Sequence, residues 1–129
     1  MSFKAKFSVA GKDYRILEAS YELQQIVDKT GRPSSEIIGG KIHVTVESTG
    51  ETDLFDWMAD PYKPLSGSLT FSKRDSDSTM KEVKFTDAYC VAYNETFSSS
   101  NETPMTIVFT LSAKKIEVGG VPFENPWAI

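Results

Sequence analysis

Histidine and cysteine carry much of the nucleophilic and metal chemistry of proteins, and this chain has one of each, His43 and Cys90. A Cys–His nucleophilic pair needs both side chains on one face of neighbouring strands, with a carboxylate or carboxamide to orient the imidazole. A single histidine cannot supply the His-rich ligand set of a zinc site. We therefore expect His43 to be a surface residue and Cys90 a packed thiol. We expect no catalytic, metal-binding or cofactor-binding residue.

Acidic residues offer a second route to chemistry. Glycoside hydrolysis needs two converging carboxylates, and four acidic residues lie close together in the chain at Glu51, Asp53, Asp56 and Asp60. Their spacing places them on the expected wet side of an amphipathic helix, where charges need no catalytic role. The strand interiors add only Asp87. The acidic triplet 75–77 lacks the glycine and the further ligand of a calcium loop. We therefore do not expect an enzyme.

Length and charge restrict the classes of protein to which the chain can belong. The 129 residues form one domain, 1–129, and 14 basic against 18 acidic residues give a net charge of −4. This charge opposes binding to nucleic acid. One cysteine excludes an internal disulfide, the start MSFKAKFS lacks the apolar run of a secretory signal, and no segment approaches the ~20 apolar residues of a membrane helix. We expect a soluble protein that folds in the cytoplasm, with no insertion into membranes.

The elements that position these residues are mostly strands, because apolar and polar residues alternate with period two along most of the chain. The pattern predicts strands over 3–9, 14–23, 41–47, 68–73, 80–93 and about 105–114. Turn-forming residues at 74–78 join the fourth and fifth of them into a hairpin. Six or seven strands with a single helix predict a small antiparallel β-barrel with the helix plugging one end.

Two finer expectations concern the core. The helix is predicted over Thr52–Ala59, ended by Asp60-Pro61, and is expected to bury four apolar side chains, which are Leu54, Phe55, Trp57 and Met58. In the strand 80–93, strict alternation puts one set of residues on a common face, namely Val83, Phe85, Tyr89, Val91 and Tyr93.

The loop Asp28–Gly40 follows neither period, because it has three glycines and a proline among small polar residues. Such long loops are usually functional. A barrel with this loop and a Trp-bearing tail at Pro126 and Trp127 fits a binding or assembly module better than an enzyme. The alternative is a small ligand-binding β-barrel with tyrosines lining a pocket, although a barrel with so few strands is normally filled by its own side chains.

Four separated segments together resemble one family, the type VI secretion system tube protein TssD/Hcp (haemolysin-coregulated protein), in its Bacteroidetes-type form. They are Thr30–Ser35 (TGRPSS), Val46–Met58 (VESTGETDLFDWM), Lys84–Tyr93 (KFTDAYCVAY) and Pro104–Gly120 (PMTIVFTLSAKKIEVGG). The likeness runs from MSFKAKF to the final ENPWAI. No single segment is a catalytic signature.

The resemblance implies a structural protein whose β-barrel subunits form hexameric rings that stack into the inner tube of a contractile injection apparatus. Its implied partners are other copies of itself, the sheath and spike proteins and the secreted effectors used in bacterial competition. It also implies a location in the bacterial cytoplasm before firing and outside the cell afterwards. The loop Asp28–Gly40 would then reach a neighbouring subunit or ring, and its expected interface residues are Arg32, Pro33, Ser34, Ser35, Ile37 and Ile38.

Overall fold

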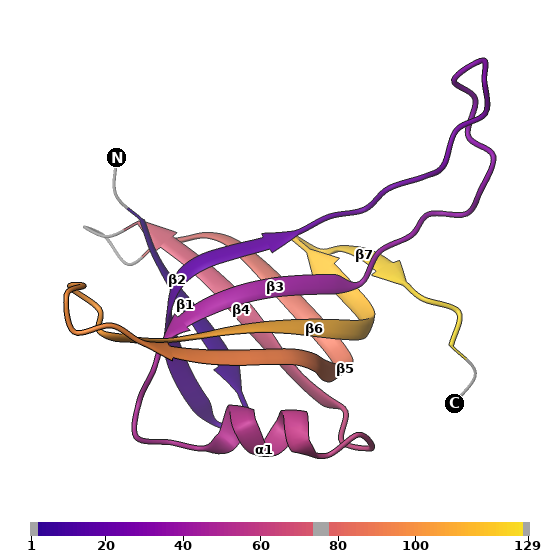
Figure 1. The fold of residues 1–129 in the computed structure, drawn as a ribbon. Coiled ribbons are helices and arrows are strands. Elements are labelled where there is room, and N and C mark those ends of the chain that lie inside the picture. Colours follow the sequence, from indigo (N-terminus) through magenta and orange to yellow (C-terminus); the bar gives the residue numbers. More distant parts are fainter. Residues whose placement is uncertain (1–2, 74–77, 128–129) are drawn as a thin grey trace.

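The computed structural model describes residues 3–73 and 78–127. Within these residues, seven strands and one helix follow one another (Figure 1). They are β1 Phe3–Val9, β2 Lys12–Tyr21, β3 Lys41–Glu47, α1 Asp53–Ala59, β4 Leu65–Lys73, β5 Thr79–Phe97, β6 Met105–Val118 and β7 Val121–Glu124. The turn predicted at 74–78 and the acidic triplet 75–77 fall, except for Ser78, outside the described residues.

The strands form one antiparallel sheet in the order β3-β2-β1-β4-β5-β6-β7. An additional pairing of β3 with β6 closes the first six of them into a barrel. The remaining strand, β7, pairs with the last residues of β6. The predicted antiparallel barrel with one short helix is confirmed. Closure leaves few strand edges open to unwanted pairing.

Side chains fill the interior of this barrel. The ring of Phe7 lies 5.6 Å from that of Phe85 and 5.1 Å from that of Phe109, measured between ring centroids. Trp57 of the helix stacks on Phe85 at 6.3 Å. Burying each such side chain is worth about 1.5–3 kcal/mol. The filled interior does not favour the alternative of a ligand-binding barrel.

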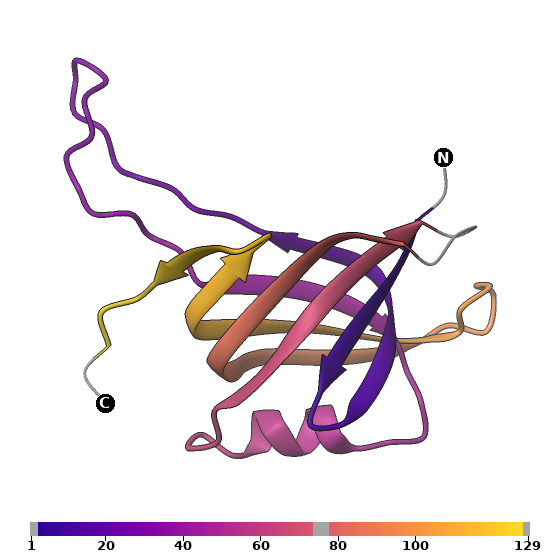
Figure 2. The same cartoon turned by 180° about the vertical axis from the view of Figure 1, so that it is seen from behind.

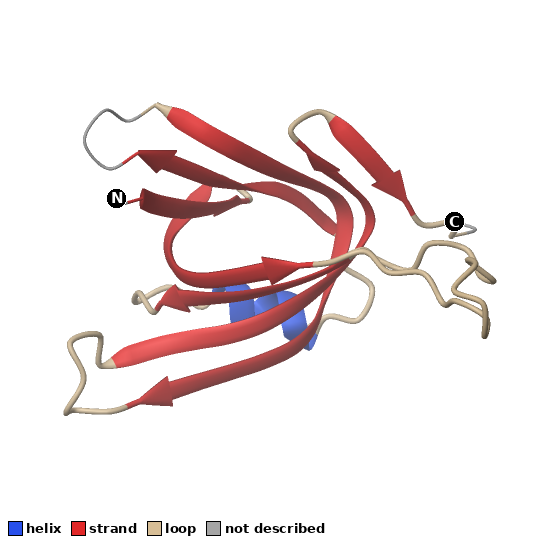
Figure 3. Cartoon of the chain, turned by 90° about the horizontal axis from the view of Figure 1, so that it is seen from above, coloured by secondary structure: helices blue, strands red, loops and turns tan. Residues whose placement is uncertain are grey.

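The helix α1 lies across one end of the barrel (Figures 1 and 3). Leu54 and Trp57 are buried, Met58 is half-buried, and the Trp57 indole N–H donates to the Lys63 carbonyl oxygen at 2.8 Å. The prediction that Phe55 is buried was wrong, because its side chain is 60% exposed, with its ring 5.5 Å from that of Tyr93 between centroids. Seven residues give a narrow apolar face at positions i, i+3 and i+4, and Phe55 falls beside it.

The predicted common face of the fifth strand was also wrong at Tyr89 and Val91. Val83 and Phe85 point inward, but the next buried residues are Ala88 and Cys90 rather than Tyr89 and Val91. The cause is a β-bulge at Asp87, whose φ is +51° and whose N–H donates to the Ser66 hydroxyl oxygen at 3.1 Å. One extra residue in a strand moves the side chains that follow it to the opposite face. A second register shift between Cys90 and Ala92 returns Tyr93 to the core side, as predicted.

Candidate assembly surface

An arm of residues 22–40 projects from the barrel between β2 and β3 (Figures 1 and 2). It contains the predicted loop 28–40 but begins earlier, since β2 ends at Tyr21 rather than at the predicted Leu23. Its two runs are paired, because Gln24 and Ile38 exchange backbone hydrogen bonds of 2.9 and 2.7 Å. The arm is therefore an ordered extension of two antiparallel runs.

The tip of the arm is built around Asp28. Its Oδ1 accepts hydrogen bonds from the Thr30 hydroxyl at 2.7 Å, the Thr30 backbone N–H at 2.9 Å and the Arg32 backbone N–H at 3.1 Å. These bonds lower the pKa of the Asp28 carboxyl below its usual value. Because the pKa is lowered, the ionised carboxyl stabilises the turn at any pH above its usual pKa. This stabilisation is lost as the pH falls through the lowered pKa of the folded protein.

The six predicted interface residues lie on this arm but divide into two kinds. Ser34 and Ser35 hold the two runs together, because the Ser34 N–H donates to the Ile26 carbonyl at 2.8 Å and the Ser35 hydroxyl accepts from the Ile26 N–H at 2.9 Å. Pro33 pairs with Val27 in an isolated bridge. The other three, Arg32, Ile37 and Ile38, have exposed side chains.

Three of the five exposed apolar side chains of the arm lie outside the predicted loop 28–40. Leu23, Ile26 and Val27 on the incoming run are exposed together with Ile37 and Ile38 on the returning run, and each of the five is 47–57% exposed. Several exposed apolar side chains on one projecting segment are typical of a protein-binding surface. The apolar residues of 23–27 are the signal in the sequence, but the predicted strand 14–23 takes in Leu23.

The root of the arm is held by the C-terminal tail, which sequence reasoning also missed. The Asn125 side-chain amide donates to the Gly39 carbonyl at 3.1 Å and to the Ala113 carbonyl at 3.0 Å, while the Asn125 backbone N–H donates to the Lys114 carbonyl at 2.7 Å. Gly40 has a φ of +95°, and a Cβ there would overlap the Asn125 amide nitrogen. Asn125 therefore joins the arm to β6.

The residues considered for chemistry are apart from one another. His43 is exposed, with its Nδ1 3.0 Å from the Thr110 hydroxyl oxygen. Cys90 is buried, and burial raises the pKa of its thiol to about 11. Asp87 is half-buried at the bulge. Within residues 3–73 and 78–127, no three metal-ligating side chains lie together and no helix is long and apolar enough to cross a bilayer.

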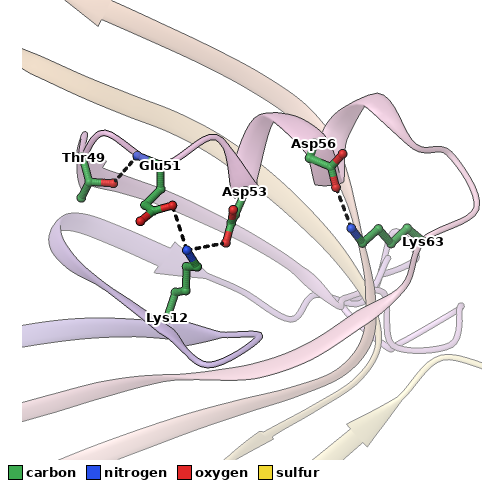
Figure 4. A network of polar contacts seen from close by, with 6 residues as sticks. All are labelled: Lys12, Thr49, Glu51, Asp53, Asp56 and Lys63. Carbon is green, nitrogen blue, oxygen red and sulfur yellow. Dashed lines mark hydrogen bonds and ion pairs between the residues drawn. The ribbon is translucent and has the colours of Figure 1, made fainter.

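The acidic residues near α1 form surface ion pairs (Figure 4). The Lys12 ammonium lies 2.8 Å from Glu51 and 3.4 Å from Asp53, and the Lys63 ammonium lies 2.6 Å from Asp56. These pairs fasten the β1–β2 turn and the segment after the helix to α1. Exposed pairs of this kind contribute little stability.

Comparisons with known proteins agree with this picture. Residues 1–128 match the model of a family described as hemolysin coregulated protein Hcp (TssD). The structure of Hcp1 from Flavobacterium johnsoniae is 49% identical, with a TM-score of 0.91, over 95% of this chain and 99% of that one. No curated protein sequence matches the chain.

More distant structures share the fold. Hcp1 from Salmonella typhimurium superposes with a TM-score of 0.76 at 13% identity, covering 92% of this chain and 86% of that one. A chain of the sheath-tube complex of an extracellular contractile injection system, PVC, superposes with a TM-score of 0.57 at 15% identity, covering 90% and 86%.

Proposed function

Since this chain belongs to the hemolysin coregulated protein family, Hcp (TssD), it is a structural tube subunit, and we propose that six copies close into a ring and that rings stack into the inner tube of a type VI secretion system. The observation that carries the proposal is the family match over residues 1–128. A ring arises when each subunit offers one face to the next and the rotation closes.

The proposed partners follow from the tube. Other copies of the chain, the sheath and spike proteins of the apparatus and the effectors carried by the tube are the proteins it contacts. The subunit acts in the bacterial cytoplasm before firing and outside the cell afterwards. Hcp is a family of structural tube proteins, and we propose that this member has no enzymatic activity of its own.

We propose the arm as a contact surface between subunits or rings, with Arg32, Ile37 and Ile38 as its contacting residues. Two properties support this assignment. The arm leaves five large apolar side chains about half exposed, and its backbone is ordered by internal hydrogen bonds before any partner binds. A preordered surface loses less entropy on binding than a flexible one. Pro33, Ser34 and Ser35 contribute by shaping the arm.

Light scattering of the purified protein tests the ring. A mass of six times 14.3 kDa at tens of micromolar is expected. A protein that stays monomeric at this concentration would contradict the proposal and favour the alternative, a small ligand-binding β-barrel.

A further inference from the structure

We propose that a cleft outside the barrel binds an organic cation, which carries an alkylammonium or a guanidinium group. The cleft has a volume of about 520 Å³ and lies where the end of α1, the middle of β5 and the C-terminal tail meet. We call it the Trp127 cleft. Six of the described residues that line it would contact the ligand, and these are Met58, Asp60, Pro61, Tyr89, Val91 and Trp127. The inference goes beyond the tube, because it concerns a ligand of the single subunit.

The bulge at Asp87 brings the first aromatic ring into the cleft. Because the residues buried after the bulge are Ala88 and Cys90, Tyr89 and Val91 point away from the core. Without the extra residue, the alternation of the strand would turn the Tyr89 ring into the barrel. Bulges are common beside binding sites, where they redirect a side chain.

The C-terminal tail brings the second ring. Asn125 fixes the tail to β6, and two residues later the ring of Trp127 lies 6.1 Å from that of Tyr89 between centroids, with the two planes tilted by 42°. Both side chains are half-buried, so part of each ring is open to a ligand. An aromatic ring attracts a cation that lies within about 6 Å of its centroid, and tryptophan does so most strongly.

The charge of the cleft is negative. Asp60 lines it, and its Oδ1 accepts the Tyr62 N–H at 2.9 Å. Asp60 forms no ion pair within residues 3–73 and 78–127, since Lys63 pairs with Asp56 at 2.6 Å instead. No lysine or arginine is among the described residues that line the cleft. A carboxylate without a cation, beside two aromatic rings, favours a positively charged ligand.

The remaining walls select an organic cation rather than a metal ion. Met58, Pro61 and Val91 offer carbon surface, which suits the methyl groups of a trimethylammonium or the methylene stem of an arginine. A metal ion would meet one carboxylate here among the described residues, whereas calcium takes about six to eight oxygen ligands. The volume falls within the range of about 300–1,000 Å³ that is usual for small-molecule clefts.

Fluorine magnetic resonance of protein labelled with fluorotryptophan tests the site, because the chain has two tryptophans and Trp57 is buried in the barrel. The probes are choline and its uncharged isostere, the dimethylbutanol in which carbon replaces the nitrogen. We expect millimolar choline to shift the Trp127 signal and to leave that of Trp57 in place. Choline should bind about tenfold more tightly than the alcohol. An alcohol that binds as tightly as choline would overturn the proposal.

A second cation distinguishes two sources of the ligand. Choline stands for a free small molecule, and Nα-acetylarginine amide stands for a basic side chain of a partner protein. Tighter binding of choline would indicate a free small molecule, and tighter binding of the arginine derivative would indicate a partner protein. Both results support an organic cation. A Trp127 signal that neither cation shifts would contradict the proposal and leave the ring untouched.

Substitution of Asp60 tests the role of charge. Asp60→Asn keeps an acceptor for the Tyr62 N–H and removes only the charge, so choline binding should weaken about threefold to fivefold. Glu102→Gln is the matched control, because it removes the same charge at an exposed position in the β5–β6 loop. The control should bind choline as the unchanged protein does. Equal affinities of the two variants would contradict a site that includes the Asp60 carboxylate.

Thiol reagents of different charge give an independent readout. In a Cys90→Ala background, Val91→Cys places a thiol in the cleft, and Val108→Cys places one outside it, at sites that are 47% and 46% exposed. A trimethylammonium methanethiosulfonate should react faster than its sulfonate counterpart at Val91→Cys, by a ratio several times larger than at Val108→Cys. Equal ratios at the two sites would overturn the selectivity for cations.

Discussion

The barrel interior and the arm show opposite ways of using apolar residues in one chain. The interior buries Phe7, Phe85 and Trp57 almost completely, so these residues have found their partners within the chain. The arm exposes Ile37 and Ile38, although its backbone is ordered by hydrogen bonds. The difference supports the proposal that the barrel supplies stability and that the arm supplies contacts with other molecules. Substitutions in the two regions should separate these two roles.

The largest effect on stability is expected from Trp57→Ala. The substitution removes a buried ring stacked on Phe85 and leaves a cavity, which should lower the free energy of unfolding by about 3–5 kcal/mol. Thermal and denaturant unfolding measure this loss. Phe55→Ala is the matched control in the same helix, because its exposed ring should cost about 1 kcal/mol or less. A Trp57→Ala protein as stable as this control would show that α1 is not docked on the barrel.

An intermediate effect is expected from Asn125→Ala. The change leaves the Gly39 and Ala113 carbonyls without their donor and should cost about 1–2 kcal/mol. Because Asn125 holds the root of the arm, hydrogen exchange at residues 22–40 should accelerate while the barrel strands stay protected. Asn101→Ala, at an exposed position in the β5–β6 loop, is the control. Unchanged exchange in the arm would mean that Asn125 does not position it.

A smaller effect on the barrel, but a large one on assembly, is expected from the triple variant Arg32→Glu, Ile37→Ser, Ile38→Ser. The three side chains are exposed, so the melting temperature of the barrel should stay nearly the same, while rings or stacks become scarcer in electron micrographs and by light scattering. Val121→Ser, an exposed apolar site on β7, should leave assembly intact. Rings and tubes as abundant as in the unchanged protein would remove the arm from the interface.

The smallest effects are expected at the two residues that first suggested chemistry. Cys90→Ala and His43→Ala should leave assembly intact. The thiol pKa of about 11 means that the thiolate appears only as the pH rises toward that value, so at pH 8 about one thiol in a thousand is ionised. Alkylation by iodoacetamide should be slow in the folded protein and fast in urea. Fast alkylation of the folded protein at pH 8 would contradict the burial of Cys90.

The sequence predicts some parts of this structure better than others for physical reasons. Alternation is regular along β1 and along residues 105–113 of β6, so these stretches could be predicted directly from the sequence. The last residues of β6, 115–118, were not predicted, because two lysines at 114 and 115 interrupt the alternation. The bulge at Asp87 depends on a hydrogen bond to Ser66 of another strand, and one extra residue there reversed the predicted face of Tyr89. The prediction for Phe55 failed because the number of helix residues that are buried depends on the surface that the helix covers.

The arm shows the same limit. That a loop projects here could be predicted from the glycines and the proline of 28–40, which match no regular period. Its beginning at residue 22 and its attachment through Asn125 did not follow, since both depend on contacts between distant parts of the chain. The resemblance to a family of tube proteins supplied the function that the residues alone left open.

Hydrogen exchange measured on dilute protein and on assembled tubes tests the division between barrel and arm most directly. If the arm is the contact surface, amides in residues 22–40 that exchange quickly in dilute protein become protected on assembly, while amides of the buried barrel strands change little. An arm that exchanges equally fast in both states, with new protection confined to the barrel wall, would contradict the assignment of contacts to the arm.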